Sequence, residues 1–423
     1  MRILVISNLY PPDVIGGYEL GCRQVVDALT AMGHDVLVLT SSSTRASAPH
    51  SGVRRHLVLK REIYGGPAPT NQAIALRRAE GRVINAHNVA VLVDTLGEFQ
   101  PDVVYLWNLD GLGAYGIAAT IAYVQQPAVW HLMDAGPNEA ATLGPGDAGP
   151  ETPLLRALSR RLRSVYIACS RRVAEEVSGS GFDFRGNLRV LPNWATTPTH
   201  EVNRQFFTSG SRKLKIVSAG QLVPHKGVYQ IIETAALLSQ QGRVDFHIDI
   251  FGSGLDDHFA SLIALRDVDR LVTLRGYLPQ RELVEKYWSC DVFLMPTWSR
   301  EPFGFAALEA ARRGCVPIVS RDCGYAEWFV DGLHCLKVAP TPEHITNLLR
   351  EILDGQRELE PIARRALGVT QDDFSLACIL PEIERAFDDA LHLPPRRPGS
   401  LHDAHRLAKL ADGLLFGHLE GHA

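Results

Sequence analysis

The sequence predicts an α/β protein made of two doubly wound domains, each with a parallel sheet covered by helices. Short apolar runs alternate with segments of helical spacing, an order typical of parallel strands joined by crossover helices. The alternation stops between Asn193 and Lys213, where polar residues dominate, and then restarts. The chain has 423 residues, 46% of them hydrophobic and 21% charged, which is enough for two such cores.

The first half opens with a complete strand, helix and strand. Ile3 to Ser7 is a continuous apolar run, as expected of a strand buried on both faces. Apolar residues at helical spacing follow from Tyr18 to Met32, Gly33 ends this helix, and Asp35 to Thr40 returns as a strand. The later patterns predict helices at 72–97, 111–123, 154–163 and 171–178, strands at 103–106, 128–131 and 166–169, and irregular segments at 41–70 and 134–153.

The second half repeats the alternation and ends in a long helix at 374–391. Its predicted strands are 216–219, 245–252, 272–276, 292–296 and 317–320, and its predicted helices are 229–239, 256–264, 281–289 and 305–313. The expected limits are 1–195 for the first domain, 196–212 for a linker, 213–373 for the second domain, and 374–423 for the last helix and tail. Ligands of such folds are expected beyond the carboxyl ends of the strands, in a crevice between the domains.

Charge, cysteines and hydropathy exclude several classes of protein. Against 43 Lys and Arg stand 47 Asp and Glu, so no chain-wide basic field exists to hold a nucleic acid. The seven cysteines are odd in number and never spaced as C-x-x-C, which favours a reducing compartment without a structural zinc site. No signal peptide and no membrane-spanning apolar stretch is visible. We therefore expect a cytoplasmic protein.

The most informative stretch runs from Trp298 to Ala311 and reads WSREPFGFAALEAA. Pro302 stands where a helix begins, and Gly304 lets the backbone approach a ligand closely. The N-terminus of that helix offers N–H groups and a positive dipole end, which suit a diphosphate. Glu301 and Glu309 flank this anion site, so their expected partners are neutral hydroxyl groups of a sugar and a ribose. An ordinary acidic first turn with a solvated Glu309 is an equally good interpretation of the residues alone.

This stretch resembles the E-x7-E motif of the retaining glycosyltransferases of family 4, which have the two-domain GT-B fold. The resemblance covers nearly the whole chain, from Gly16-Gly17 to the helix that ends near Leu391. It implies two Rossmann-like domains facing across a cleft, with the C-terminal helix returning to the N-terminal domain. The N-terminal domain would bind the acceptor, and the C-terminal domain would bind the nucleotide sugar.

The resemblance also implies roles for the residues of this motif. By match, Glu309 binds the ribose of the nucleotide and Glu301 contacts the donor sugar. The amides of Phe303, Gly304 and Phe305 would face the donor sugar and the phosphate.

A second element runs from Ala219 to Gly227 and reads AGQLVPHKG. Lys226 could be the cation that neutralises a departing phosphate, and the alternative is a surface lysine near a helix start. The segment resembles the G-R-x4-K-G element of the same family, which favours the functional role. It departs from that element at Gln221, where an arginine is usual. A neutral amide donates hydrogen bonds but adds no charge to hold the pyrophosphate.

Further candidates lie in the first half of the chain. Gly16 and Gly17 allow backbone N–H groups to reach a phosphate or the donor sugar, although a tight turn explains them equally well. His131 ends a strand and resembles the cleft histidine that meets the donor sugar in the family, whereas a lone histidine is more often structural. Asp134 either orients His131 or caps the next segment.

Two turns in the second half carry weaker signals. The sequence FGSG at Phe251 to Gly254 follows a strand, but Asp257 stands where a dinucleotide-binding G-x-G-x-x-G needs glycine. This is a poor NAD fingerprint. The turn from Arg275 to Leu278 resembles the base-contacting turn of the family, in which the main chain of Tyr277 would contact the base.

A basic stripe occupies the region from Arg156 to Arg172. Its arginines alternate with leucines on one predicted helix, a pattern that can bind anionic lipid or an acidic acceptor at the inner face of a membrane. A plain solvated helix face is the commoner alternative. The stripe contains Arg156, Arg160, Arg161, Arg163, Arg171 and Arg172.

Together these features predict a hexosyltransferase that uses a UDP-, GDP- or ADP-linked sugar and retains the anomeric configuration. As the resemblance implies, no side chain acts as nucleophile, and a phosphate oxygen takes the proton of the acceptor hydroxyl. Lys226, Gly17 and the helix start at Gly304 and Phe305 would stabilise the leaving charge. We expect no metal and no cofactor, and a carbohydrate, lipid-linked or small-molecule acceptor.

Two rival functions stay open at this point. A phosphorylase or a sugar-nucleotide epimerase could use the same architecture. An NAD-binding Rossmann protein is the candidate from another class, and the absent G-x-G-x-x-G argues against it.

Overall fold

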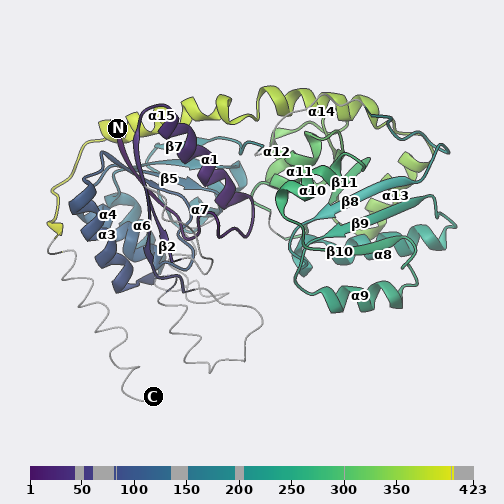
Figure 1. Ribbon diagram of the computed structural model, residues 1–423, viewed down its shortest axis with the longest axis horizontal. Coiled ribbons are helices and arrows are strands. Elements are labelled where there is room, and N and C mark those ends of the chain that lie inside the picture. The colour runs from purple at the N-terminus through teal and green to yellow at the C-terminus, as the bar shows by residue number, and fades with distance from the viewer. Residues whose placement is uncertain are drawn as a thin grey trace, which may run out of the picture. The chain divides into compact units, whose positions relative to one another are not determined.

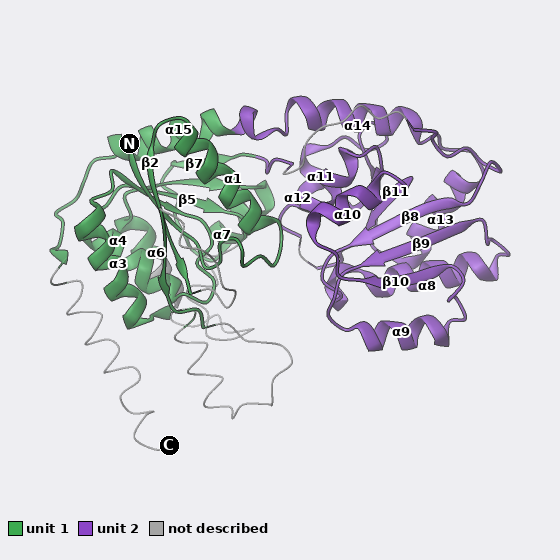
Figure 2. Cartoon of the chain, viewed as in Figure 1, with its two compact units in different colours: residues 1–191, 380–423 green, residues 192–379 purple. Residues whose placement is uncertain are grey.

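The computed structural model describes residues 1–42, 52–60, 81, 83–134, 151–195, 204–299, 301–401 and 403. It contains two parallel sheets, each with helices packed against it (Figure 1). The chain divides into two compact units (Figure 2): unit 1 is Met1–Leu191 with Leu380–Ala423, and unit 2 is Pro192–Ile379. The predicted fold class, two Rossmann-like sheets in one chain, is confirmed.

Unit 1 is built on a sheet that, within the described residues, has seven parallel strands in the order β3-β2-β1-β4-β5-β6-β7. The strands are β1 Arg2–Ile6, β2 Asp35–Ser41, β3 Val53–Leu57, β4 Val103–Leu106, β5 Ala128–Leu132, β6 Ser164–Ala168 and β7 Leu188–Val190. Its helices are α1 Gly17–Ala31, α3 Ala86–Phe99, α4 Ala114–Val124, α6 Glu151–Arg161 and α7 Arg171–Gly179. The central strands β4, β5 and β6 are buried at every position, which explains their continuous apolar sequences.

The edge strands β3 and β7 were not expected from the sequence. The β3 sequence VRRHL buries only Leu57, and β7 has three residues, none of them fully buried. Neither strand carries the apolar run that predicts a central strand. The part of the segment 41–70 that the structure describes therefore contains a strand, and the prediction of an irregular segment is wrong there.

The last helix, α15 Leu376–His392, belongs to unit 1 from Leu380 onward and packs against it. The ring of Phe387 meets Tyr105 of β4 edge to face, with 5.1 Å between centroids. Arg189 of β7 forms ion pairs with Glu382 and Asp389 of the helix. The predicted return of the C-terminal helix to the N-terminal unit is thus confirmed.

Unit 2 is built on a sheet that has, in the described part of the chain, six parallel strands in the order β10-β9-β8-β11-β12-β13. They are β8 Leu214–Ala219, β9 Phe246–Phe251, β10 Val272–Gly276, β11 Val292–Met295, β12 Val316–Ser320 and β13 Leu336–Val338. The helices are η2 Pro224–Lys226, α8 Val228–Gln240, α9 Asp256–Leu265, α10 Gln280–Tyr287, α11 Phe305–Ala311, α12 Gly324–Trp328, α13 Pro342–Leu353 and α14 Glu360–Asp372. The strand β13 and the helices α12, α13 and α14 were not predicted from the sequence.

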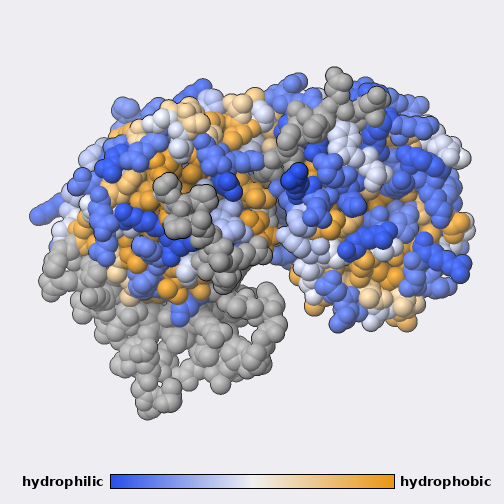
Figure 3. Space-filling view, viewed as in Figure 1, coloured by the Kyte–Doolittle hydropathy of each residue, from blue (hydrophilic) through white to orange (hydrophobic). Residues whose placement is uncertain are grey.

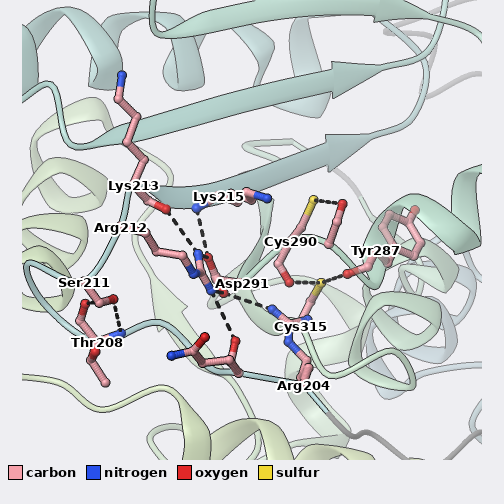
Figure 4. Close-up of polar contacts among 12 residues, drawn as sticks. Arg204, Thr208, Ser211, Arg212, Lys213, Lys215, Tyr287, Cys290, Asp291 and Cys315 are labelled. Atoms are coloured by element: carbon pink, nitrogen blue, oxygen red, sulfur yellow. Dashed lines mark hydrogen bonds and ion pairs between the residues drawn. The ribbon is translucent and has the colours of Figure 1, made fainter.

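A buried carboxylate just before β11 holds the described residues 204–212, which precede β8. Asp291 accepts two hydrogen bonds from Arg212, both at 2.6 Å, and one from Arg204 at 2.9 Å. It also accepts the backbone N–H of Lys215 at 3.0 Å. Figure 4 shows both guanidinium groups converging on this carboxylate. The described end of the predicted linker 196–212 is therefore fixed to the sheet of unit 2.

Candidate functional site

The loop after β8 brings Lys226 to the end of β11. Gly227 adopts φ +86 between η2 and α8, and a Cβ added there would lie 2.2 Å from the carbonyl oxygen of Pro296. Only glycine therefore lets the two chain segments pass this closely. The indole Nε1 of Trp298 donates to the carbonyl oxygen of Pro224 at 2.6 Å. The backbone N–H of Trp298 donates to the carbonyl oxygen of His225 at 3.1 Å. These contacts fix the turn that carries Lys226.

Lys226 and Glu301, two of the predicted site residues, form an ion pair. The Nζ of Lys226 donates to an oxygen of Glu301 at 2.7 Å, and both side chains are partly buried. Nearby, burial and the charge of Lys226 lower the pKa of His225, while Glu301 opposes the shift. His225 is therefore favoured in its neutral form, and Lys226 is the positive group of this turn.

The segment between Glu301 and Glu309 leads directly into α11. Gly304 precedes the helix at φ +107, a conformation that favours glycine. The Glu301 carbonyl accepts the N–H of Gly324 at 2.9 Å, which ties this loop to α12. Phe303 is buried in the core of unit 2. The helix starts at Phe305 as predicted.

Glu309 lies inside unit 2 rather than on its surface. Its side chain is only 4% exposed, so the interpretation as a solvated helix residue is wrong. The side-chain amide of Gln280, the first residue of α10, donates a hydrogen bond to its carboxylate. This bond joins the start of α10 to the middle of α11.

The glycines of Phe251 to Gly254 are explained by packing between loops. A Cβ on Gly252 would lie 1.8 Å from the Gly220 carbonyl oxygen, and one on Gly254 would lie 2.6 Å from that of Leu222. The Leu222 N–H donates to the Ser253 carbonyl at 2.9 Å across the same contact. This pattern needs no phosphate or dinucleotide to account for it.

The remaining predicted residues of unit 2 are exposed. Gln221 lies at the surface directly after Gly220. Tyr277 is 62% exposed and follows Gly276, whose φ of +72 turns the chain after β10. Both are accessible to a ligand.

In unit 1, the Gly16–Gly17 loop is fixed by a carboxylate. The backbone N–H groups of Gly16 and Ile15 donate to the side chain of Glu19 at 2.9 and 3.2 Å, in a capping box at the start of α1. The Gly16 amide thus donates to a carboxylate in the structure, and its predicted contact with a phosphate or donor sugar stays a prediction. Gly17 is the first residue of α1, as the sequence pattern indicated to within one residue.

His131 lies at the end of β5 and is fully buried. The hydroxyl of Tyr105 lies 2.6 Å from its Nδ1, and the ring of Trp107 packs at 4.8 Å between centroids. Burial lowers the pKa of His131 to about 3, so the imidazole is neutral at physiological pH. His131 is thus packed inside unit 1, and its predicted contact with the donor sugar stays a prediction.

The basic stripe is only partly an open surface. Arg163 donates to the carbonyl groups of Leu391 and Leu393 at 2.5 and 2.6 Å and so caps α15. Arg172 lies 3.5 Å from Glu176. The exposed members are Arg156, Arg160, Arg161 and Arg171. On the face seen in Figure 3, hydrophilic residues are mixed with hydrophobic ones over the described part of each unit.

Two residues that support these loops were not recognised in the sequence. Gln280 is far from Glu309 along the chain, and no local pattern links them. Arg55 of β3 donates to the carbonyls of Tyr10 and Pro11 at 2.5 to 3.2 Å, which supports the loop before α1. Arg55 was hidden because the charged sequence of β3 does not predict a strand.

Among the described residues, no group of three or more His, Cys, Asp or Glu side chains could hold a metal ion. In the same part of the chain, no helix is long and apolar enough to cross a membrane.

Comparison with known proteins gives two matching family models. One, described as Glycosyltransferase Family 4, matches residues 15–197, and the other, described as Glycosyl transferases group 1, matches residues 200–367. A glycogen synthase of Mycobacterium tuberculosis is 27% identical over 399 residues, which cover 88% of this chain and 91% of the relative. A GDP-mannose-dependent alpha-mannosyltransferase of Mycolicibacterium smegmatis is 26% identical over 377 residues, or 83% of this chain and 89% of the relative.

Solved structures share the same fold. Anabaena Alr3699/HepE in complex with UDP and glucose has a TM-score of 0.65 and 20% identity, and the match covers 92% of this chain and 99% of that one. A sucrose-phosphate synthase from Thermosynechococcus elongatus has a TM-score of 0.69 and 16% identity over 92% of this chain and 98% of that one.

Proposed function

Because this chain belongs to glycosyltransferase family 4, whose members are retaining enzymes that use nucleotide-sugar donors, we propose that unit 2 binds the donor through Lys226, Glu301, Glu309 and the start of α11. The observation that carries this proposal is the joining of the two predicted motifs. Lys226 from the loop after β8 and Glu301 from the loop after β11 meet at 2.7 Å. Two residues that are 75 positions apart in the sequence are thus in direct contact.

The charges around the Lys226–Glu301 ion pair and the start of α11 suit a nucleoside diphosphate linked to a sugar. Lys226 is the cation that a diphosphate requires as it departs, and the N–H groups at the start of α11 add a second stabilising contribution. Glu301 and Glu309 are acceptors for hydroxyl groups, on the donor sugar and the ribose respectively. Glu301 also balances the charge of Lys226 through their ion pair.

The proposed reaction is transfer of a hexose with retention of configuration. The acceptor hydroxyl enters on the face from which the diphosphate leaves, and a phosphate oxygen takes its proton. Lys226 stabilises the negative charge that develops on the diphosphate. No side chain acts as nucleophile, and no metal takes part. The acceptor is a carbohydrate, a lipid-linked glycan or a small molecule, bound by unit 1.

Hexosyl transfer is supported by what the relatives act on. A glycogen synthase and a GDP-mannose-dependent mannosyltransferase are similar to this chain over most of its length, and HepE is known with UDP-glucose. These names favour glucose carried by UDP or mannose carried by GDP. The fold similarity to HepE alone does not select the base.

A donor screen tests the proposal. The full-length protein is incubated with UDP-glucose, GDP-mannose or ADP-glucose, with and without EDTA, and release of the free nucleotide is followed. One donor is expected to be hydrolysed slowly, with water taking the place of the acceptor and the nucleotide released, at the same rate with EDTA present. Release that requires inorganic phosphate would indicate a phosphorylase, conversion of the donor without release an epimerase, and abolition by EDTA with rescue by Mg²⁺ a metal-dependent site.

A further inference from the structure

We propose that Trp298 is a stacking surface for the donor sugar, and that its indole ring adds to the affinity for a nucleotide-linked hexose but not for the free nucleotide. This inference rests on the proposed function, in which Lys226 contacts the diphosphate and Glu301 contacts the donor sugar. Trp298 would contact the substrate directly, through the carbon atoms of its ring.

Trp298 is exposed, unlike the other tryptophans. The sequence contains six tryptophans, all of them in the described part of the chain. Trp298 is 51% exposed, whereas the other five are buried or half-buried. An aromatic ring or a guanidinium group packs against four of those five, namely Trp107, Trp130, Trp288 and Trp328. Within the described residues, no ring or cation packs against Trp298.

Two hydrogen bonds fix the orientation of the Trp298 indole. Its Nε1 donates to the carbonyl oxygen of Pro224 at 2.6 Å, and the backbone N–H of Trp298 donates to the carbonyl oxygen of His225 at 3.1 Å. Nε1 is the only polar atom of a tryptophan side chain, so the exposed remainder of the ring consists of carbon. Because the ring is already held in place, little conformational entropy is lost when a ligand stacks on it.

The same hydrogen bonds place Trp298 beside the proposed donor contacts. Its two partners directly precede Lys226, whose Nζ lies 2.7 Å from a carboxylate oxygen of Glu301. Trp298 itself precedes Glu301 on the loop after β11. All of these residues belong to unit 2, which binds the donor in the proposed function, whereas unit 1 binds the acceptor. We therefore assign the exposed indole to the sugar of the donor.

A hexose ring suits such a surface. A pyranose carries hydroxyl groups around its rim and C–H groups on its two faces. The face of an aromatic ring carries partial negative charge, so it attracts the C–H groups and also buries apolar area against them. The hydroxyl groups at the rim stay available to Glu301. A free nucleoside diphosphate has no sugar beyond its diphosphate, so it gains nothing from this contact.

The test compares the affinity for a free nucleotide with the affinity for its sugar conjugate. Wild type, Trp298→Ala, Trp298→Phe and Trp298→Gln are titrated by calorimetry with UDP, GDP and ADP, and then with UDP-glucose, GDP-mannose or ADP-glucose, according to the nucleotide that binds. Phenylalanine keeps an aromatic face but has no N–H donor. Glutamine keeps an N–H donor the same number of bonds from Cα as the indole nitrogen, but it has no aromatic face.

The expected result is a selective loss of affinity for the nucleotide sugar. Trp298→Ala and Trp298→Gln should weaken its binding about fivefold and leave that of the free nucleotide within about twofold of wild type. Trp298→Phe should stay within about twofold of wild type for both ligands.

Fluorescence gives a second measurement, which a merely structural role of Trp298 would not change. Because Trp298 is the exposed tryptophan, acrylamide quenching of the wild type reports mainly on this residue. The nucleotide sugar is expected to protect against quenching more than the free nucleotide does, and the difference should vanish in Trp298→Phe.

The outcomes separate this inference from the proposed function. Leu265 is 73% exposed at the end of α9, so Leu265→Ala is the control for loss of an exposed apolar side chain and should change neither affinity. If Trp298→Ala and Trp298→Phe weaken both ligands equally while Trp298→Gln behaves like wild type, Trp298 only holds the turn of Lys226 and the inference is wrong. Wild-type affinity for the nucleotide sugar in Trp298→Ala would also overturn it, and in both cases the proposed function stands. If the wild type binds none of these nucleotides or nucleotide sugars, the proposed function is wrong, and the inference falls with it.

Discussion

The free-energy cost of removing the buried Asp291 carboxylate from its ion cluster in unit 2 can be predicted from the structure. Its side chain is 1% exposed, and that of Arg204 is 9% exposed. Asp291→Ala would leave the guanidinium of Arg204 buried beside an apolar methyl group, whereas the more exposed Arg212 can turn to water. Removing one partner of a buried pair typically costs about 3–5 kcal/mol. At about 2–4 °C per kcal/mol for a unit of this size, the midpoint of unfolding should fall by about 6–20 °C.

Differential scanning calorimetry of the full-length protein measures this shift, and a surface ion pair provides the control. Asp245 lies 2.8 Å from Arg243, but its side chain is 44% exposed, so Asp245→Ala should cost about 0.2–1 kcal/mol. A shift of the same size in both variants would refute the reasoning, because it would mean that burial adds nothing to the cost of leaving Arg204 without Asp291.

Three further predictions concern the site and unit 1. Lys226→Ala should lower kcat/KM by at least about 10²–10³-fold, because it removes a cation placed where negative charge develops. Gln221 is exposed and uncharged, so Gln221→Ala should lower kcat/KM distinctly less. Equal losses in steady-state kinetics would contradict this. Glu301→Gln should leave the affinity for free nucleotide close to wild type while turnover falls, and calorimetry that finds nucleotide binding equally impaired would show that its role is confused with that of Glu309. The folded pKa of His131, about 3, lies below its unfolded value near 6.5, so below pH 6.5 the unfolded chain binds a proton that the folded chain does not. The free energy of unfolding should therefore fall by about 1.4 kcal/mol per pH unit from this residue as the pH drops from 6.5 towards 3, and urea titrations at pH 7 and pH 5 should show a shallower dependence in His131→Phe.

The fold was predictable where burial dictates the sequence. A central parallel strand is covered on both faces, so β4 reads as the continuous run Val103–Leu106, and its predicted limits are those of the structure. The edge strand β3 buries only Leu57, and its sequence VRRHL lacks that run. In contrast, α13 was missed although its signals were present, with Thr341 as N-cap and Pro342 as its first residue.

The candidate site was predictable where a motif is local. The segment from Glu301 to Glu309 begins its helix at Phe305 as expected, because Gly304 and the proline before it mark the start of a helix. The bond from the Gly16 amide to Glu19 was harder to predict, because a glycine at the N-cap lacks the hydroxyl that marks a capping box. The bond between Gln280 and Glu309 was not predictable, since it depends on which helices become neighbours in the folded sheet.

Calorimetric titration of wild type and Glu309→Gln with UDP, GDP and ADP tests the central claim most directly. The claim is that unit 2 holds the nucleotide of the donor, with the buried Glu309 at its ribose. Wild type is expected to bind one of the three, and Glu309→Gln to lose about 1–3 kcal/mol of that binding free energy, the contribution of charge-assisted hydrogen bonds. Unchanged affinity in Glu309→Gln, beside clear binding by the wild type, would contradict it.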